Sequence, residues 1–165
     1  MPNQRDTDIG LGRTSRLADN FTIQEFAVTA HTAFRPGLLE AAWEHWVDLK
    51  LLATMLQHIR DHFCAPVVIH SGIRSAALNE HLRSIGVPAS RTSQHMLGQA
   101  ADFHVRGVDL KEVFDWVRLE SGLKFGQLIL ENDPPAWIHL STVGSIKRTQ
   151  HAMTWSRHNG YVTVK

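Results

Sequence analysis

Two histidines and an aspartate are the residues of this sequence whose types and spacing could hold a metal ion. His95 and Asp102 lie seven positions apart, with one glycine and two alanines between them that would let an ion approach the backbone closely. His139 lies in a short run, residues 137–140, with the alternation of a strand. Two imidazole nitrogens and one carboxylate oxygen suit zinc, and three protein ligands leave a fourth position for water, as in catalytic zinc sites. The sequence therefore predicts one zinc ion held by His95, Asp102 and His139.

Chemistry at such a site also needs a general base to take a proton from water. Glu131 and Asp133 are the candidates, because the chain turns back toward His139 through a proline-containing stretch, residues 132–135. Glu131 ends a predicted strand, whereas Asp133 is closer to His139 in sequence and also fits a solvated turn. Both residues therefore stay candidates for the base on spacing alone.

The first half of the chain is predicted to be mainly helical. Thr22 and Glu25 form a capping box, so a short helix should begin there, with Phe21 and Phe26 at the positions of a hydrophobic staple. A long helix is expected over residues 39–63, since it carries apolar residues at helical spacing. Its buried stripe should consist of Leu52, Met55, Leu56, Ile59 and Phe63. The single cysteine, Cys64, follows it and is expected to be a small buried residue.

The second half should supply the strands that carry the candidate ligands. Ser75 can cap a helix that Gly86 closes, and Asp109 can cap another that ends near residue 120. Strands are expected at residues 67–69, 99–105, 125–131, 136–141, 147–155 and 161–164. In the second of these strands, Asp102 should point away from Ala101 and Phe103, which can enter the core.

Helices that lead and strands that trail favour an α+β fold, in which the N-terminal helices pack on a small, mostly antiparallel sheet. The length of 165 residues suits one domain. We expect that domain over residues 20–165, after a polar and flexible segment over residues 1–19.

Composition excludes several functional classes. Hydrophobic residues make up 43% and the formal net charge is +1, without a basic face, so no nucleic-acid partner is expected. No apolar run approaches the ~18 residues of a membrane span. The first residues lack the apolar stretch of a signal peptide, so synthesis in the cytosol is expected.

Three segments, in this order, resemble the zinc D-Ala-D-Ala carboxypeptidases of the M15 class, and most closely their compact, often phage-encoded branch. The segments are Ser71-Gly72-Ile73-Arg74-Ser75, Ser93-Gln94-His95 through Asp102, and Trp137-Ile138-His139. The resemblance covers roughly residues 20–164. It implies a hedgehog-like or DD-peptidase-like fold, one zinc ion, and cleavage of peptide bonds in bacterial peptidoglycan stem peptides.

The resemblance also implies roles for single residues. His95, Asp102 and His139 would bind zinc, and Glu131 would be the base. Arg74 would hold the substrate or polarise the scissile carbonyl, and Ser93 would contact the substrate. A guanidinium suits both roles of Arg74, because it can pair with a terminal carboxylate or stabilise an oxyanion.

Two departures from the family pattern concern the substrate. Ile73 stands where members of the family often have tyrosine, and the segment from Asn79 to His95 is longer than usual and has only Gly86 where members tend to have a glycine pair. The bond cleaved could be D-Ala–D-Ala or L-Ala–D-Glu. We expect a monomer that acts on the wall after release from the cell or as part of a virion, as an endolysin would.

Two alternatives remain beside the wall peptidase. The first is a zinc-stabilised module without turnover, which would bind the cell wall or build a virion on the same fold. The second is a zinc amidase that acts on a peptide outside the wall.

Overall fold

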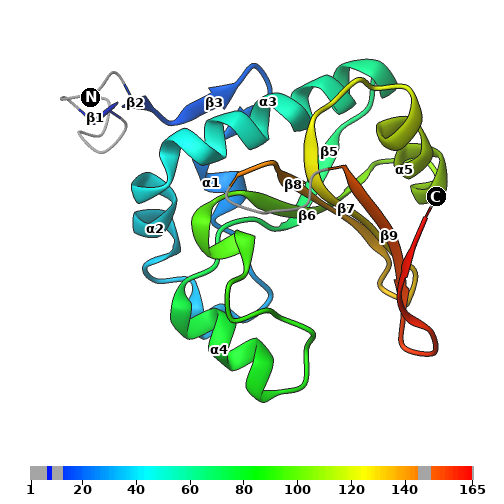
Figure 1. Ribbon diagram of the computed structural model, residues 1–165. Coiled ribbons are helices and arrows are strands. Elements are labelled where there is room, and N and C mark those ends of the chain that lie inside the picture. The colour runs from blue at the N-terminus through cyan, green and yellow to red at the C-terminus, as the bar shows by residue number, and fades with distance from the viewer. Residues whose placement is uncertain (1–6, 9–12, 145–149, 165) are drawn as a thin grey trace.

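The computed structural model describes residues 7–8, 13–144 and 150–164, and its helices and strands confirm the expected α+β class (Figure 1). The helices are α1 (Ile23–Phe26), α2 (Leu38–Glu44), α3 (Trp46–Phe63), α4 (Ala76–Ser84) and α5 (Leu110–Leu119), with short 3-10 turns η1 (Thr32–Phe34) and η2 (Gln94–Leu97). The strands are β1 (Thr7–Asp8), β2 (Arg13–Thr14), β3 (Arg16–Ala18), β4 (Phe21–Thr22), β5 (Val67–Ser71), β6 (Ala100–Val105), β7 (Phe125–Glu131), β8 (Trp137–Thr142), β9 (His151–Ser156) and β10 (Gly160–Thr163). None of the described helices is long and apolar enough to cross a membrane.

Six of the described strands form the main sheet, in the order β10-β9-β7-β8-β6-β5. Neighbouring strands run antiparallel except β7 and β9, which are parallel, so the expected mostly antiparallel sheet is confirmed. Asp102 on β6 lies opposite His139 on β8, and His139 lies opposite Ile129 on β7. Because directly opposed residues share a face of a sheet, the two predicted ligands project from the same face.

The opposite face of the sheet forms the core with the helices. Ala101 and Phe103 flank Asp102 on β6 and are both fully buried, as the alternation predicts. Helix α3 contacts β5, β6 and β8, and α5 contacts β6, β7 and β8. Helices α3 and α5 therefore pack on one side of the sheet (Figure 1). Asp102 and His139 project from the other side.

Local signals place the helix starts as expected. The backbone N–H of Thr22 donates to Oε2 of Glu25 at 2.7 Å, which closes the capping box of α1. The rings of Phe21 and Phe26 lie 6.2 Å apart as the staple requires. At α4, Oγ of Ser75 accepts the N–H of Leu78 at 3.2 Å.

The helix expected over residues 39–63 is divided in two. His45, with φ −101° and ψ 26°, leaves the helical region between α2 and α3. The change of direction lets Leu38 on α2 and Leu49 on α3 both reach full burial in the same core. Cys64 is exposed, contrary to expectation, because it ends α3 in a left-handed conformation at the surface.

The flexible segment predicted over residues 1–19 lies partly outside the described residues. The start of the strand predicted over residues 147–155 also lies outside them. Within the described part, β3 pairs with β4 and Leu17 is 2% exposed in the core. The packed core therefore extends at least to Leu17. The boundary predicted at residue 19 between a flexible segment and the domain stays a prediction.

Candidate metal centre and its cleft

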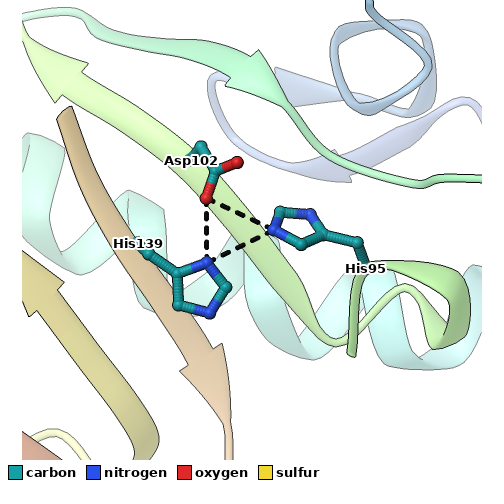
Figure 2. Close-up of side chains that lie close together, drawn as sticks. All are labelled: His95, Asp102 and His139. Atoms are coloured by element: carbon teal, nitrogen blue, oxygen red, sulfur yellow. Dashed lines mark hydrogen bonds and ion pairs between the residues drawn. The ribbon is translucent and has the colours of Figure 1, made fainter. Parts of the chain in front are cut away.

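Three donor atoms converge where β6, β8 and the turn η2 meet (Figure 2). Nε2 of His95 and Oδ1 of Asp102 lie 3.3 Å apart, and Nε2 of His95 and Nδ1 of His139 also lie 3.3 Å apart. Nδ1 of His139 lies 2.8 Å from Oδ1 of Asp102. The structure therefore brings together the three residues predicted as ligands, in a group that could hold a metal ion.

Two of these three separations match those of a tetrahedral zinc ion. Zinc–nitrogen bonds of 2.0–2.1 Å at tetrahedral angles place neighbouring donor atoms about 3.3 Å apart. Two of the three separations in the group equal that value, and the third is shorter. The absence of a sulfur donor among the three ligands is typical of catalytic rather than structural zinc sites.

A backbone carbonyl orients His95. Its Nδ1 lies 2.7 Å from the oxygen of Gly72, which can only accept, so Nδ1 carries the proton and Nε2 presents its lone pair to the group. Gly72 comes this close because it packs directly on α1. A Cβ at this position would lie 2.4 Å from the backbone oxygen of Phe26.

Arg74 binds the carboxylate of the candidate ligand Asp102. Its Nη2 donates to Oδ2 of Asp102 at 2.7 Å, and its Nε donates to Oγ of Ser71 at 3.0 Å. Its backbone N–H donates to the carbonyl of His95 at 3.0 Å. Arg74 therefore fixes one oxygen of Asp102 and leaves the other oxygen facing the two histidines.

The charges of the group favour the protonation states that metal binding requires. Burial alone would raise the pKa of Asp102, but His95 and His139 outweigh it and hold that pKa well below its usual range. The pKa of His95 is lowered, chiefly because its fully enclosed ring is desolvated. An ionised carboxylate and a neutral imidazole are the forms that bind metal.

Glu131 and Asp133 differ in their surroundings. Glu131 lies at the end of β7, and burial together with the charge of Asp102 raises its pKa from 4.5 to about 7. Asp133 instead accepts the backbone N–H of Arg157 at 2.6 Å and so ties the β7–β8 turn to the β9–β10 hairpin. Glu131 therefore has the surroundings of a group that can exchange a proton near neutral pH, whereas Asp133 has a structural partner.

The group opens into a cleft of about 990 Å³ on the uncovered face of the sheet. Arg74, Ser93 and Glu131 line this cleft together with the three candidate ligands. Ser93 is 8% exposed and stands just before η2. The long segment noted in the sequence forms one rim, through residues 85–90. Ile73 is fully buried in the core, so that position offers the cleft no side chain.

Other histidines lie outside the group. Nε2 of His70 lies 2.7 Å from Nδ1 of His104, so these two pair with each other beside the group. The ring of His62 stacks on Trp116 at 3.9 Å between ring centres, which is packing on the helical side.

A row of aromatic residues in the cleft was missed by sequence reasoning. Trp137, Glu131, Trp155 and Tyr161 lie opposite one another in turn across β8, β7, β9 and β10. All four line the cleft. Alternation within each strand could have placed them on the face of the ligands, but the order of the strands could not be read from the sequence.

Comparison with known families gives one match. A family model described as Peptidase M15 matches residues 19–141, a range that contains all three candidate ligands, Arg74, Ser93 and Glu131. No curated protein matches the chain.

Proposed function

Because the chain belongs to the M15 peptidase family, we propose that it is a zinc metallopeptidase that hydrolyses a peptide bond in peptidoglycan stem peptides. The observation that carries the proposal is the group of His95, Asp102 and His139, whose donor atoms have zinc-like separations, in one cleft with Glu131. A site built only for stability would have no use for a half-buried carboxyl group with a raised pKa in the same cleft.

Zinc bound by the three residues would supply Lewis-acid chemistry, lowering the pKa of water toward ~7 and polarising the scissile carbonyl. Glu131 would take the proton from the attacking water. The water oxygen then bonds to the carbonyl carbon, the carbon–nitrogen bond breaks, and Glu131 returns the proton to the leaving amine. Because the pKa of Glu131 is about 7 in the absence of metal, its carboxyl group suits both acceptance and return of a proton near neutral pH.

We propose that Arg74 and Ser93 contact the substrate, because both side chains line the cleft. Nη2 and Nε of Arg74 already bond Asp102 and Ser71, but a guanidinium has five N–H donors, so others remain for a carboxylate or an oxyanion. Ser93 lines the cleft two residues before His95 and can offer its hydroxyl to a peptide group.

Both candidate bonds, D-Ala–D-Ala and L-Ala–D-Glu, remain in the proposal, and the enzyme is proposed to act as a monomer. The site of action would be the cell wall, reached after release from the cell or from a virion. A zinc-binding wall module without turnover is the alternative that the experiment must separate.

The test is digestion of purified peptidoglycan by zinc-loaded protein, read by mass spectrometry. Wild type should release terminal alanine or a defined peptide. Glu131→Gln should lose at least 100-fold in rate while it still binds zinc, because a positioned base contributes about 10²–10⁴-fold. Asp133→Asn is the matched carboxylate control and should stay within a few-fold of wild type.

If purified peptidoglycan stays intact after incubation with the zinc-loaded wild-type protein, the wall-peptidase proposal is rejected and the binding module is favoured. Cleavage of a dipeptide or unrelated peptide without attack on the wall would favour the amidase. An Asp133→Asn variant as impaired as Glu131→Gln would remove the assignment of the base.

A further inference from the structure

The aromatic row extends the cleft away from the metal group along a single line of the sheet. Trp155 is directly opposite Glu131, and Tyr161 is directly opposite Trp155. Since neighbouring strands lie about 4.8 Å apart, Trp155 is one step of about 5 Å and Tyr161 two steps of about 10 Å from Glu131. The cleft therefore has a second part, next to the site of bond cleavage but built on β9 and β10.

The rings of this second part are available to a ligand. Tyr161 is 52% exposed, and Trp155 is partly exposed. Their ring centres lie 6.3 Å apart at an angle of 49°, so they form a continuous aromatic surface, here called the aromatic shelf. Aromatic residues of this size are normally buried, and two that stay open inside a cleft mark a binding surface.

Electrostatics agree that the phenol of Tyr161 faces the cleft. Burial raises the pKa of Tyr161, and the charges of Glu131 and Asp102 raise it further. Two acidic residues on β7 and β6 thus act on a hydroxyl carried by β10. The hydroxyl stays protonated at neutral pH and can donate a hydrogen bond.

The chemistry of the shelf does not match a stem peptide alone. Alanine methyl groups and charged side chains give an aromatic ring little area to cover. The amino sugars of peptidoglycan match an aromatic surface better, because each sugar ring has an apolar face of C–H groups. The hydroxyl and acetamido groups of the sugar can form hydrogen bonds with the indole N–H of Trp155 and the phenol of Tyr161. Sugars are also attached directly to the stem peptide through a lactoyl ether.

We propose that the aromatic shelf of Trp155 and Tyr161 is a binding site for the amino sugar that carries the stem peptide. This inference rests on the proposed peptidoglycan substrate and deepens it. Both residues lie beyond residue 141, where the family match ends, so the shelf belongs to a part of the chain that the family model does not describe.

The position of the shelf also discriminates between the two candidate bonds. Each residue of an extended peptide spans about 3.5 Å, so the carbonyl of L-Ala lies one residue, about 3.5 Å, from the lactoyl group. The carbonyl of the first D-Ala in D-Ala–D-Ala lies four residues, about 14 Å, from it. A shelf that starts about 5 Å from Glu131 and ends at the edge strand suits the nearer bond. The shelf therefore favours cleavage of L-Ala–D-Glu.

The first test is binding to the metal-free protein, which needs no catalysis. The probes are N-acetylmuramoyl-L-alanyl-D-isoglutamine and the sugar-free N-acetyl-L-alanyl-D-isoglutamine, titrated while the five tryptophan indole N–H signals are followed by NMR. We expect the sugar-containing probe to bind at least 10-fold more tightly and to shift the Trp155 signal, assigned by its loss in Trp155→Leu.

The variants Trp155→Leu and Tyr161→Leu should each reduce this preference toward unity. Val162→Ala is the matched control, because Val162 is the next residue on β10, is 47% exposed and alternates to the opposite face. Tyr161 is half-exposed and lies on the edge strand β10, so its replacement should not prevent folding. If Trp155→Leu does not fold, Tyr161→Leu tests whether the shelf binds the sugar. Equal affinity for the two probes, or an unchanged preference in folded Tyr161→Leu, would overturn the proposal.

The second test is the ratio of kcat/KM for the two probes with zinc-loaded enzyme. Wild type should prefer the sugar-containing probe at least 10-fold, and Tyr161→Leu should lower that ratio. Val162→Ala should preserve both the ratio and the rate with the sugar-free probe. Equal rates for the two probes would reject the shelf and leave the peptidase proposal intact. Absence of cleavage of both probes, together with retained sugar preference in the titration, would reject cleavage of L-Ala–D-Glu and leave the shelf, whereas the digestion of purified peptidoglycan decides the peptidase proposal.

Discussion

Arg74 and Asp102 form a buried ion pair in which Nη2 of the arginine donates to Oδ2 of the aspartate at 2.7 Å, with side chains 11% and 8% exposed. Oδ1 of the same carboxylate lies with the donor atoms of the two histidines. The arginine therefore orients the carboxylate of the candidate ligand Asp102, in addition to the substrate contact proposed for it. The family resemblance implied only the second role.

Replacing Arg74 by lysine should weaken zinc binding. A lysine ammonium is a single point donor and lacks the planar fork whose two nitrogens bond Asp102 and Ser71, so the carboxylate would be held less rigidly. We expect zinc affinity to fall about 10–100-fold, as is typical when a residue that supports a metal ligand is changed. The measurement is competition with a chromophoric chelator.

Arg106→Lys is the matched control for this change, because Arg106 is an exposed arginine just after β6. Its zinc affinity should equal that of wild type. If Arg74→Lys also binds zinc as tightly as wild type, Asp102 does not depend on the ion pair for its orientation.

Glu131 should make the stability of the metal-free protein depend on pH. Its pKa rises from 4.5 to about 7 on folding, chiefly through burial, so the folded state holds this proton more tightly than the unfolded chain. Stability must then fall as pH increases from about 4.5 to about 7. Glu131→Gln lacks this loss, and its advantage over wild type should grow across that window and level off above it.

Urea denaturation of both proteins at several pH values, with chelator present, measures this difference. Titrations of His95 and Asp102 occur in both proteins and largely cancel in the comparison. A difference that stays constant between pH 4.5 and 7.5 would show that the Glu131 carboxyl group is not desolvated as the structure indicates.

Zinc should stabilise the protein through the predicted ligands. A ligand at 1,000 times its dissociation constant stabilises the folded state by about 4 kcal/mol, so the midpoint of thermal unfolding should rise with zinc and return with chelator. His139→Ala should abolish that rise. His70→Ala should preserve it, because His70 pairs with His104 and not with the three donor atoms. A lost response in His70→Ala, or a retained one in His139→Ala, would place the metal elsewhere.

Gly72→Ala should disturb both packing and metal binding. A Cβ there would meet the backbone oxygen of Phe26 at 2.4 Å, and backbone atoms cannot move aside as a flexible side chain can. Overpacking of this kind costs about 1–3 kcal/mol of stability. The carbonyl of Gly72, which accepts from His95, should shift with it and lower zinc affinity.

Gly107→Ala provides the comparison for the glycine change, since a Cβ there meets no atom within 4 Å and only its φ of +75° is unfavourable. It should lose about 1–2 kcal/mol through backbone strain and keep full zinc affinity. Unfolding experiments and chelator competition on both variants test this. Equal zinc affinity in the two variants would contradict the proposed role of the Gly72 carbonyl.

Much of the local structure was predictable from the sequence, because its causes are local. The capping box of Thr22 and Glu25 and the cap at Ser75 involve residues three positions apart, and both helices begin where these signals lie. Alternation along β6 correctly placed Asp102 opposite in direction to Phe103. The α+β class and the three residues of the candidate metal group followed from such patterns and from the ordered motifs.

Other features were decided only by the tertiary structure. The break at His45 serves a core shared by α2 and α3, and no residue near it marks the break. The pairing of Arg74 with Asp102 joins positions 28 apart. Asp133 gains its partner from Arg157, which lies on the far hairpin. The aromatic row depends on the strand order β8-β7-β9-β10 and on the parallel pairing of β7 with β9. Strand order and register arise from contacts between residues distant in the chain, so the sequence determined which residues could do chemistry, and the packing of the sheet decided which of them meet.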